Sequence, residues 1–219
     1  MVFGRFMELL APVNCLGCGL DGAVFCTTCI GAASKMRPVC FRCGQPSFEG
    51  KTCEACLGYT QLAGASVGAF YEGSVKELIL RLKFYRLRLA HEAAARLVTE
   101  QIPAGLKFEI VTSVPVSAGR YRERGYNQSE LIAKLVARQL GLPYLSLLGR
   151  LTSTHQMGVS RAMRLQQIAG AFFVLRRLRG ERVLIVDDVI TTGATLSECA
   201  STLVAAGAES VWGAVVARH

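Results

Sequence analysis

The residues best suited to chemistry lie between positions 186 and 195, at the end of an apolar run that begins at Arg182. Asp187 and Asp188 are adjacent carboxylates, and the loop that follows contains Thr191, Thr192, Gly193, Ala194 and Thr195. Hydroxyls and backbone amides at the start of a helix bind phosphate, and glycine lets the backbone close around the anion. Because two carboxylates would repel that phosphate, we expect them to accept hydrogen bonds from paired ribose hydroxyls, with a magnesium ion nearby.

A β-turn followed by a helix cap is the alternative for these residues, and it would suffice for Thr-Thr-Gly alone. The whole run, placed between an apolar strand and a helix, favours phosphate binding instead. The loop is not of the Walker type, because it contains no Gly-Lys-Ser or Gly-Lys-Thr.

Eight of the nine cysteines form four Cys-x-x-Cys pairs, and the second two pairs repeat the first two after 25 to 27 residues. Gly19 and Gly44 follow the first pair of each copy, where a tight metal-binding turn needs a positive φ. Four thiolates with no open position make a structural zinc site. We expect one site of Cys15, Cys18, Cys26 and Cys29, and a second of Cys40, Cys43, Cys53 and Cys56.

A cross-braced pairing would use the same eight cysteines, although the repeat argues against it. Disulfides and an iron–sulfur cluster are further alternatives. Disulfides need an oxidising compartment, and residues 1–12, with one Arg and an apolar stretch broken by Glu8, do not resemble a secretory signal. We therefore expect a cytoplasmic protein without membrane insertion.

The charge of the chain is unevenly distributed. Its formal net charge is +9, and residues 1–60 hold 5 basic and 4 acidic side chains against 20 and 12 in the remainder. Two tetrathiolate zinc sites would each add a charge of about −2, all of it in the first part. A polyanionic partner is therefore expected to contact mainly the second part.

Strand and helix patterns alternate after residue 60, which predicts an α/β domain over 61–219 behind a small module over 1–60. Strands are expected near 67–71, 108–114, 171–175 and 182–186, and helices over 74–101, from 127 to 141 and after 195. Residues 120–128 are expected to form a basic loop, and 152–167 a second loop. Lys83 lies off the apolar face of the first helix, either as part of a solvated basic side or as a polyanion contact.

The run from Val186 to Thr195 resembles the phosphoribosyl pyrophosphate (PRPP) signature of type I phosphoribosyltransferases. The chain is more closely similar to the ComF family of competence-associated proteins. Three further features carry this resemblance: the cysteine pairs, the sequence Arg124-Gly-Tyr-Asn-Gln128, and His155-Gln156 followed by Ser160, Arg161 and Arg164. They extend over almost the full length and imply a type I phosphoribosyltransferase-like parallel sheet flanked by helices, preceded by a double zinc ribbon.

The resemblance also implies roles for individual positions. Asp187 and Asp188 would be the catalytic and ribose-binding pair, and Thr191 to Thr195 would bind the 5′-phosphate. The pyrophosphate loop would consist of Val114, Pro115, Val116 and Ser117, and residues 152–164 would form a flap over it. ComF proteins usually have Pro-x-Pro where this chain has Ser113-Val-Pro115, which is a departure in the pyrophosphate loop.

Magnesium with PRPP, single-stranded DNA and a DNA-uptake or helicase protein are the cofactors and partners that the resemblance implies. The candidate nucleic-acid contacts are Arg120, Arg122, Arg124, Arg161, Arg164 and Lys83. Tyr121 and Tyr126 lie between the arginines as stacking rings, but the same arginines could instead neutralise pyrophosphate. Three functions are compatible with these features: a phosphoribosyltransferase, a PRPP sensor linked to DNA, and an adaptor that docks a partner through its zinc module.

Overall fold

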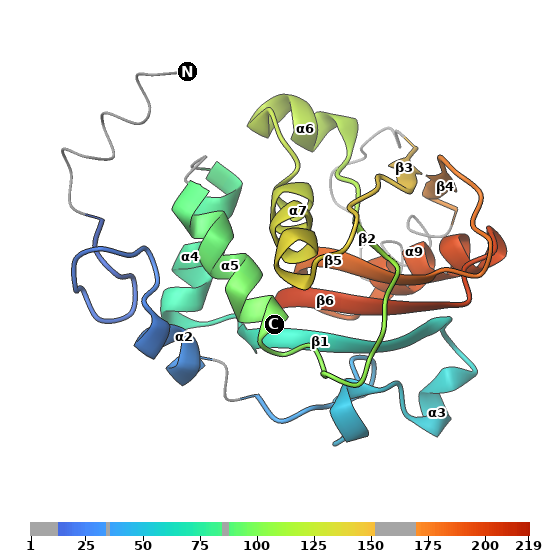
Figure 1. Ribbon diagram of the computed structural model, residues 1–219, viewed down its shortest axis with the longest axis horizontal. Coiled ribbons are helices and arrows are strands. Elements are labelled where there is room, and N and C mark those ends of the chain that lie inside the picture. Colours follow the sequence, from blue (N-terminus) through green and yellow to red (C-terminus); the bar gives the residue numbers. More distant parts are fainter. Residues whose placement is uncertain (1–12, 34–35, 85–87, 152–169) are drawn as a thin grey trace, which may run out of the picture.

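The main sheet has four parallel strands. The computed structural model describes residues 13–33, 36–84, 88–151 and 170–219 (Figure 1). The strands are β1 (Leu62–Phe70), β2 (Ile110–Ser113), β5 (Arg182–Ile190) and β6 (Ser210–Arg218), in the spatial order β1-β6-β5-β2. The two central strands are buried along most of their length, as the apolar run at the start of β5 predicts.

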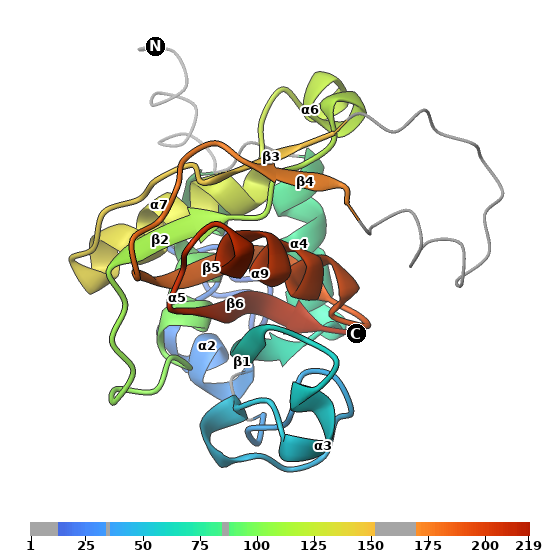
Figure 2. The same ribbon diagram turned by 90° about the vertical axis from the view of Figure 1, so that its right-hand side faces the viewer.

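Helices cover both faces of the sheet, as Figure 2 shows. One face packs against α4 (Gly73–Phe84), α5 (Arg88–Thr99) and α7 (Gln128–Leu140), and the other against α9 (Ala194–Ala205). The strands supply both cores by alternation, because Leu184 and Val186 point to the first face and Val183 and Ile185 to the second. A short antiparallel pair, β3 (Leu148–Arg150) and β4 (Phe172–Val174), lies beside the carboxyl end of β2.

The two cysteine hairpins are built alike, which confirms the internal repeat. An isolated antiparallel bridge joins Asn14 to Asp21 in the first hairpin and Val39 to Pro46 in the second. Gly19 and Gly44 have φ values of +76° and +77°, as their places in the turns predict. The halves that follow differ, with α2 (Thr27–Ala33) in the first copy, and η1 (Phe48–Gly50) and α3 (Glu54–Leu57) in the second.

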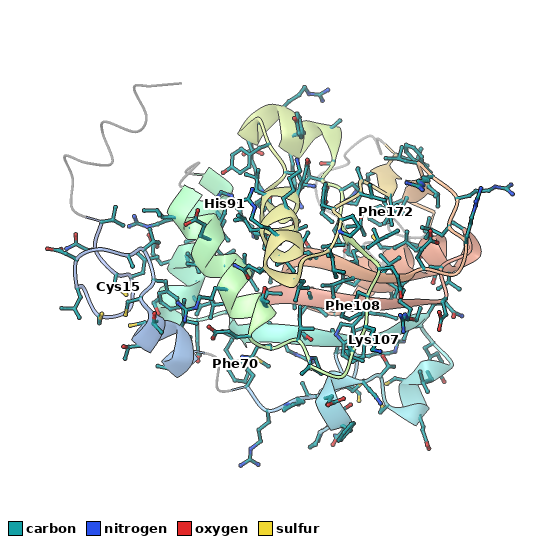
Figure 3. All side chains as sticks on the ribbon, viewed as in Figure 1. Cys15, Phe70, His91, Lys107, Phe108 and Phe172 are labelled. Carbon is teal, nitrogen blue, oxygen red and sulfur yellow. The ribbon has the colours of Figure 1, made fainter. Side chains whose placement is uncertain are left out.

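The two copies pack against opposite faces of the sheet. Cys15, Val24 and Phe25 of the first copy belong to the core under α4 and α5, and Figure 3 shows Cys15 beside α2. Phe41 of the second copy belongs to the core that α9 covers. The second copy also pairs with β1, where the Thr52 amide donates to the Ala63 carbonyl over 2.8 Å.

Two predictions of secondary structure are wrong. The region expected to form one helix over 74–101 contains two helices, α4 and α5, which pack against each other. The Tyr126 hydroxyl donates to the Leu82 carbonyl over 2.7 Å, in the last turn of α4, where helical carbonyls lack partners within the helix. The expected basic loop at 120–128 is largely helical, because Ser117 caps α6 (Ala118–Arg124) and Gly125 ends it with a φ of +73°.

The sequence analysis predicted neither the strand β6 nor the continuation of β5 beyond residue 186. β6 has no counterpart in the sequence analysis, and its stretch Val-Trp-Gly-Ala-Val-Val-Ala lacks the polar alternation that marks a half-buried strand. β5 continues to Ile190, so that Asp187 and Asp188 lie within the strand and not after it. The predicted loop at 152–167, the flap over 152–164, and Arg161 and Arg164 fall outside the described residues.

Candidate functional site

The acidic pair and the predicted pyrophosphate loop lie at one edge of the sheet. β2 and β5 are parallel neighbours, so their carboxyl ends meet there. The Val114 amide donates to the Val186 carbonyl over 3.0 Å, which continues the pairing of the two strands up to the acidic pair. Asn127 also holds the start of the loop, because its side-chain amide donates to the Val114 carbonyl over 3.0 Å. The sheet therefore brings Val114, the first residue of the predicted pyrophosphate loop, next to the acidic pair.

Both carboxylates are held by hydrogen bonds from the start of α7. The Ser129 hydroxyl donates to Asp187 Oδ1 over 2.8 Å, and the Gln128 side-chain amide donates to Asp188 Oδ2 over 3.1 Å. The Asp188 amide also donates to Asp187 Oδ1 over 2.9 Å. Asn127 begins the helix by capping the Ser129 amide over 3.1 Å. The carboxylates are thus fixed in orientation before any ligand binds.

Lys83 is a member of this site. Its Nζ lies 3.2 Å from Asp188 Oδ2, and both side chains are largely buried. The sequence analysis places Lys83 among candidate nucleic-acid contacts, whereas in the structure its ammonium group faces the acidic pair. This ammonium compensates part of the negative charge that two adjacent carboxylates concentrate.

Asp187 is the carboxylate with the altered proton affinity. Burial and the neighbouring charge of Asp188 raise its pKa from 3.8 to about 7, against the lowering effects of the Ser129 hydrogen bond and Lys83. A group that is partly protonated near neutral pH is one that a bound cation or a set of hydroxyl donors would ionise.

The predicted phosphate loop opens α9 as expected. Gly193 is the N-cap residue with a φ of +75°, and the Thr192 hydroxyl accepts a hydrogen bond from the Ala194 amide over 3.4 Å. Thr191 is exposed and Thr192, Ala194 and Thr195 are half-buried, so the loop faces outward at the same edge as the acidic pair. The first amides of a helix have no partner within the helix and are suited to receive an anion.

The basic residues of α6 fall into two groups. Arg120 and Arg122 are exposed, as is Tyr121 with 51% of its surface accessible. Arg124 is half-buried, and its guanidinium donates to the Gln128 side-chain oxygen over 3.0 Å. Tyr126 is buried, with its ring edge-on to that of His91. Arg124 therefore supports the acidic pair through Gln128, Tyr126 packs inside the fold, and Arg120, Tyr121 and Arg122 face solvent.

Arg150 on β3 extends the basic surface beside the site. Burial lowers its pKa, and so does the charge of Arg120, while the charge of Asp187 acts in the opposite sense. Arg150 is thus close enough to both groups for their charges to act on it, and the sequence analysis did not single it out.

The eight paired cysteines form the two sequential groups predicted from the repeat. One sulfur from each residue lies within 4.8 Å of every other in its group, which separates Cys15, Cys18, Cys26 and Cys29 from Cys40, Cys43, Cys53 and Cys56. The Cys18 and Cys26 sulfurs are 3.8 Å apart, and those of Cys43 and Cys53 are 3.6 Å apart. Sulfurs at about 2.3 Å from one tetrahedral ion would lie about 3.8 Å apart, so both groups have the size of a zinc site.

Each group contains one cysteine that is stabilised as a thiolate. Burial alone would raise the pKa of Cys15, but the backbone amides of Cys26, Cys18 and Gly17 lower it to about 6. Cys40 behaves in the same way, with amides that lower its pKa to about 6. The neighbouring sulfur of Cys26 raises the pKa of Cys29 to about 12, as expected where several thiols share a small volume. Cys199 is separate from both groups and buried in the core, as predicted.

Comparison with known proteins places the chain in a family. Residues 127–219 match the model of the phosphoribosyl transferase domain. The chain is 30% identical over 220 residues to the DNA utilization protein YhgH of Salmonella typhimurium, with 93% of this chain and 96% of that protein aligned. It is 31% identical over 206 residues to competence protein F of Haemophilus influenzae, with 84% and 88% covered. The chain belongs to the ComF family.

Among solved structures, this ComF-family chain is similar to the glutamine PRPP amidotransferase of B. subtilis complexed with ADP and GMP. The similarity has a TM-score of 0.44 at 20% identity and covers 63% of this chain and 30% of that one. The matched domain and the two cysteine groups confirm the predicted fold class, a phosphoribosyltransferase-like α/β sheet preceded by a cysteine-rich part that fits a double zinc ribbon. No helix in the described part of the chain is long and apolar enough to span a membrane.

Sequence reasoning missed the residues that support the acidic pair from other elements. Gln128 and Ser129 were part of a helix start, yet nothing assigned them to the carboxylates that they hold. A usable signal was available, because polar residues at the start of a helix that follows one parallel strand lie near the carboxyl end of its neighbour. Phe41 packs against Gly193 of the predicted phosphate loop, and no pattern in the sequence indicates this contact.

Proposed function

We propose that this protein binds PRPP together with magnesium at the carboxyl ends of β2 and β5. The observation that carries the proposal is the acidic pair, which is held by Ser129, Gln128 and Lys83 at the same edge as an outward-facing phosphate loop. A carboxylate accepts hydrogen bonds from two ribose hydroxyls, and the amides of 192–195 receive the 5′-phosphate. The loop 114–117 then receives the pyrophosphate.

The donor set fits magnesium bound with the ligand. Asp187 and Asp188 offer two carboxylates, and magnesium is usually held by one or two carboxylates together with substrate phosphates. When bound, the ion would neutralise the pyrophosphate charge. The charges of Asp187 and Arg120 both act on Arg150, whose guanidinium would add positive charge beside the site.

The two cysteine groups fit zinc in a structural role. Each offers four sulfurs at the separation that a tetrahedral ion requires, and four protein ligands leave no open position for catalysis. We propose two zinc ions per chain and assign the fold of residues 13–60 to their presence.

We propose that single-stranded DNA binds over α6. Arg120, Tyr121 and Arg122 are exposed on this helix, and its cap Ser117 belongs to the pyrophosphate loop. Arginines that contact phosphates and a ring that stacks on a base are the usual elements of sequence-tolerant binding. The relatives named for DNA utilization and competence support a link to DNA uptake, and we propose a cytoplasmic location for the protein.

The test of PRPP binding is isothermal titration of the zinc-loaded protein, with and without magnesium. Wild-type protein is expected to bind PRPP only when magnesium is present, and Asp187→Asn combined with Asp188→Asn is expected to abolish binding with an unchanged circular dichroism spectrum. Retained affinity in this variant would show that the ribose assignment is wrong. Ribose 5-phosphate and pyrophosphate, titrated separately, distinguish the two halves of the site.

The test of DNA binding is fluorescence anisotropy with a labelled single-stranded oligonucleotide at several salt concentrations. Arg120→Ala with Arg122→Ala should weaken binding and reduce the slope of log K against log salt by about 2. Arg138→Ala, on the exposed side of α7, is the matched control. An unchanged salt slope would contradict the assignment of α6. Pyrophosphate release from bound PRPP distinguishes a transferase from a sensor.

A further inference from the structure

We infer that Phe41 is a positioning residue for the phosphate loop, and that the second cysteine group therefore controls ligand binding whereas the first does not. This inference rests on the proposed function. Phe41 follows Cys40 directly in the second group, and its side chain is fully buried. A methyl group placed on Gly193 would lie 2.5 Å from Cδ2 and 2.6 Å from Cε2 of Phe41, so the ring packs flush against the loop.

The second cysteine copy, taken here as residues 40–60, makes further contacts with the same region. The Arg218 guanidinium donates to the Cys40 carbonyl over 3.4 Å, and Arg218 ends the strand that pairs with Ile190. The Thr60 hydroxyl donates to the Ser197 hydroxyl over 3.0 Å, and Ser197 lies in the first turn of α9. The second cysteine copy is thus attached on both sides of the loop at 191–195.

Phe41 acts by restricting the conformations available to the loop at 191–195. Gly193 has a φ of +75° and is the point at which the chain turns from β5 into α9. Without the ring, the loop could relax toward the space that the ring now fills, and the amides of 192–195 would lose their common direction. A ring anchored next to a metal ligand can hold this position only while the cysteines of its hairpin are held together.

The first copy is an internal control, because Leu16 occupies the position of Phe41 in the repeat. Leu16 is half-buried and packs into the core under α4 and α5, on the other face of the sheet. Its copy is joined to α5 where Arg96 donates to the Thr27 hydroxyl over 3.0 Å. Disturbing the first copy should therefore affect stability without moving the phosphate loop.

The experiment compares four variants of the zinc-loaded full chain: Phe41→Ala, Leu16→Ala, Cys43→Ser and Cys18→Ser. The two serine variants are matched, because both cysteines are exposed members of their groups. Hydrogen–deuterium exchange of the peptide covering 190–197 reports on the loop without any ligand. Titration with PRPP and magnesium reports on binding, and a zinc-release assay confirms which group has lost its ion.

Phe41→Ala and Cys43→Ser should each speed amide exchange in 190–197, and Leu16→Ala and Cys18→Ser should not. Loss of one charge-assisted hydrogen bond to phosphate corresponds to roughly tenfold to a hundredfold weaker binding, which we expect only for the first two variants. Equal exchange in all four variants would overturn the inference. Phe41→Leu is a second probe that keeps the site apolar, and it should give an intermediate rate of exchange.

The outcome separates this inference from the proposed function. If wild-type protein does not bind PRPP, the proposed ligand is wrong, while exchange at 190–197 still reports whether Phe41 positions the loop. If wild-type protein binds PRPP and Phe41→Ala binds it equally well, the proposed function stands and the role of Phe41 is wrong.

Discussion

Gly193→Ala should destabilise the protein by more than the usual cost of placing alanine in a left-handed turn. Its φ of +75° is unfavourable for a residue with a side chain, at a cost of about 1 to 2 kcal/mol. The new methyl group would also lie 2.5 Å from the Phe41 ring, which is fully buried. Overpacking of this kind costs about 1 to 3 kcal/mol, so the total is about 2 to 5 kcal/mol.

Gly141→Ala isolates the backbone contribution. Gly141 ends α7 with a φ of +68°, and a methyl group placed there has no atom within 4 Å. This substitution should cost only about 1 to 2 kcal/mol. The difference between the two variants then measures the contact between Gly193 and Phe41.

The assay is denaturant unfolding of zinc-loaded protein, extended to a double-mutant cycle. In a Phe41→Ala background, Gly193→Ala should cost no more than Gly141→Ala, because the ring that it meets is gone. The coupling free energy between positions 41 and 193 is therefore expected at about 1 to 3 kcal/mol. If Gly193→Ala is no more destabilising than Gly141→Ala, or if its cost is unchanged without the ring, Phe41 does not restrict position 193.

Three further predictions concern the acidic pair and its support. Because the folded-state pKa of Asp187 is raised from 3.8 to about 7, the folded protein holds this proton more tightly than the unfolded chain. The free energy of unfolding of wild-type protein, relative to Asp187→Asn, should therefore fall as pH rises from 4 to 7, and a constant difference between pH 5 and pH 8 would contradict this. Lys83→Met should lower the free energy of unfolding at pH 7 by about 1 to 3 kcal/mol, because it leaves buried Asp188 without its cation. Lys76→Met, on the exposed side of α4, is the control and should lower it by less than about 0.5 kcal/mol. Equal effects of the two substitutions in urea unfolding would show that the ion pair is not stabilising. Tyr126→Phe should cost about 1 kcal/mol by removing the hydrogen bond to the α4 backbone, and thermal unfolding would reveal an unchanged stability if that bond contributes nothing.

Local patterns were sufficient for the parts of the site that lie close together in the chain. The cysteine pairs, their repeat and the turn glycines predict the two groups, because the hairpin geometry depends on only a few neighbouring residues. The turn from β5 into α9 was predictable for the same reason, since Gly193 and the neighbouring threonines follow one another in the chain. Spacing along the chain determines such features almost completely.

Contacts between distant segments could not be read from the sequence. Lys83 reaches Asp188 from a helix that lies 105 positions earlier, and its spacing on α4 indicates only that it lies off the apolar face. Phe41 meets Gly193 because the sheet brings the second hairpin against the start of α9. Both contacts depend on strand order, and the order β1-β6-β5-β2 includes a strand that the sequence analysis did not predict.

The helices were mispredicted where tertiary contacts decide their limits. The apolar periodicity of α4 continues into α5, so one helix over 74–101 satisfied the pattern, although the two helices pack on each other. In α6, arginines alternate with tyrosine and glutamate and give no apolar stripe, which is why a loop was expected. Its cap at Ser117 and its end at Gly125 were the signals that could have predicted a helix.

A crystal structure of the zinc-loaded protein grown with magnesium and PRPP would show directly where the ligand binds. We expect the 5′-phosphate on the backbone amides of 192–195, the ribose hydroxyls on Asp187 and Asp188, and the pyrophosphate beside 114–117. A ligand bound elsewhere on the protein, or a phosphate that does not contact the loop before α9, would contradict this placement.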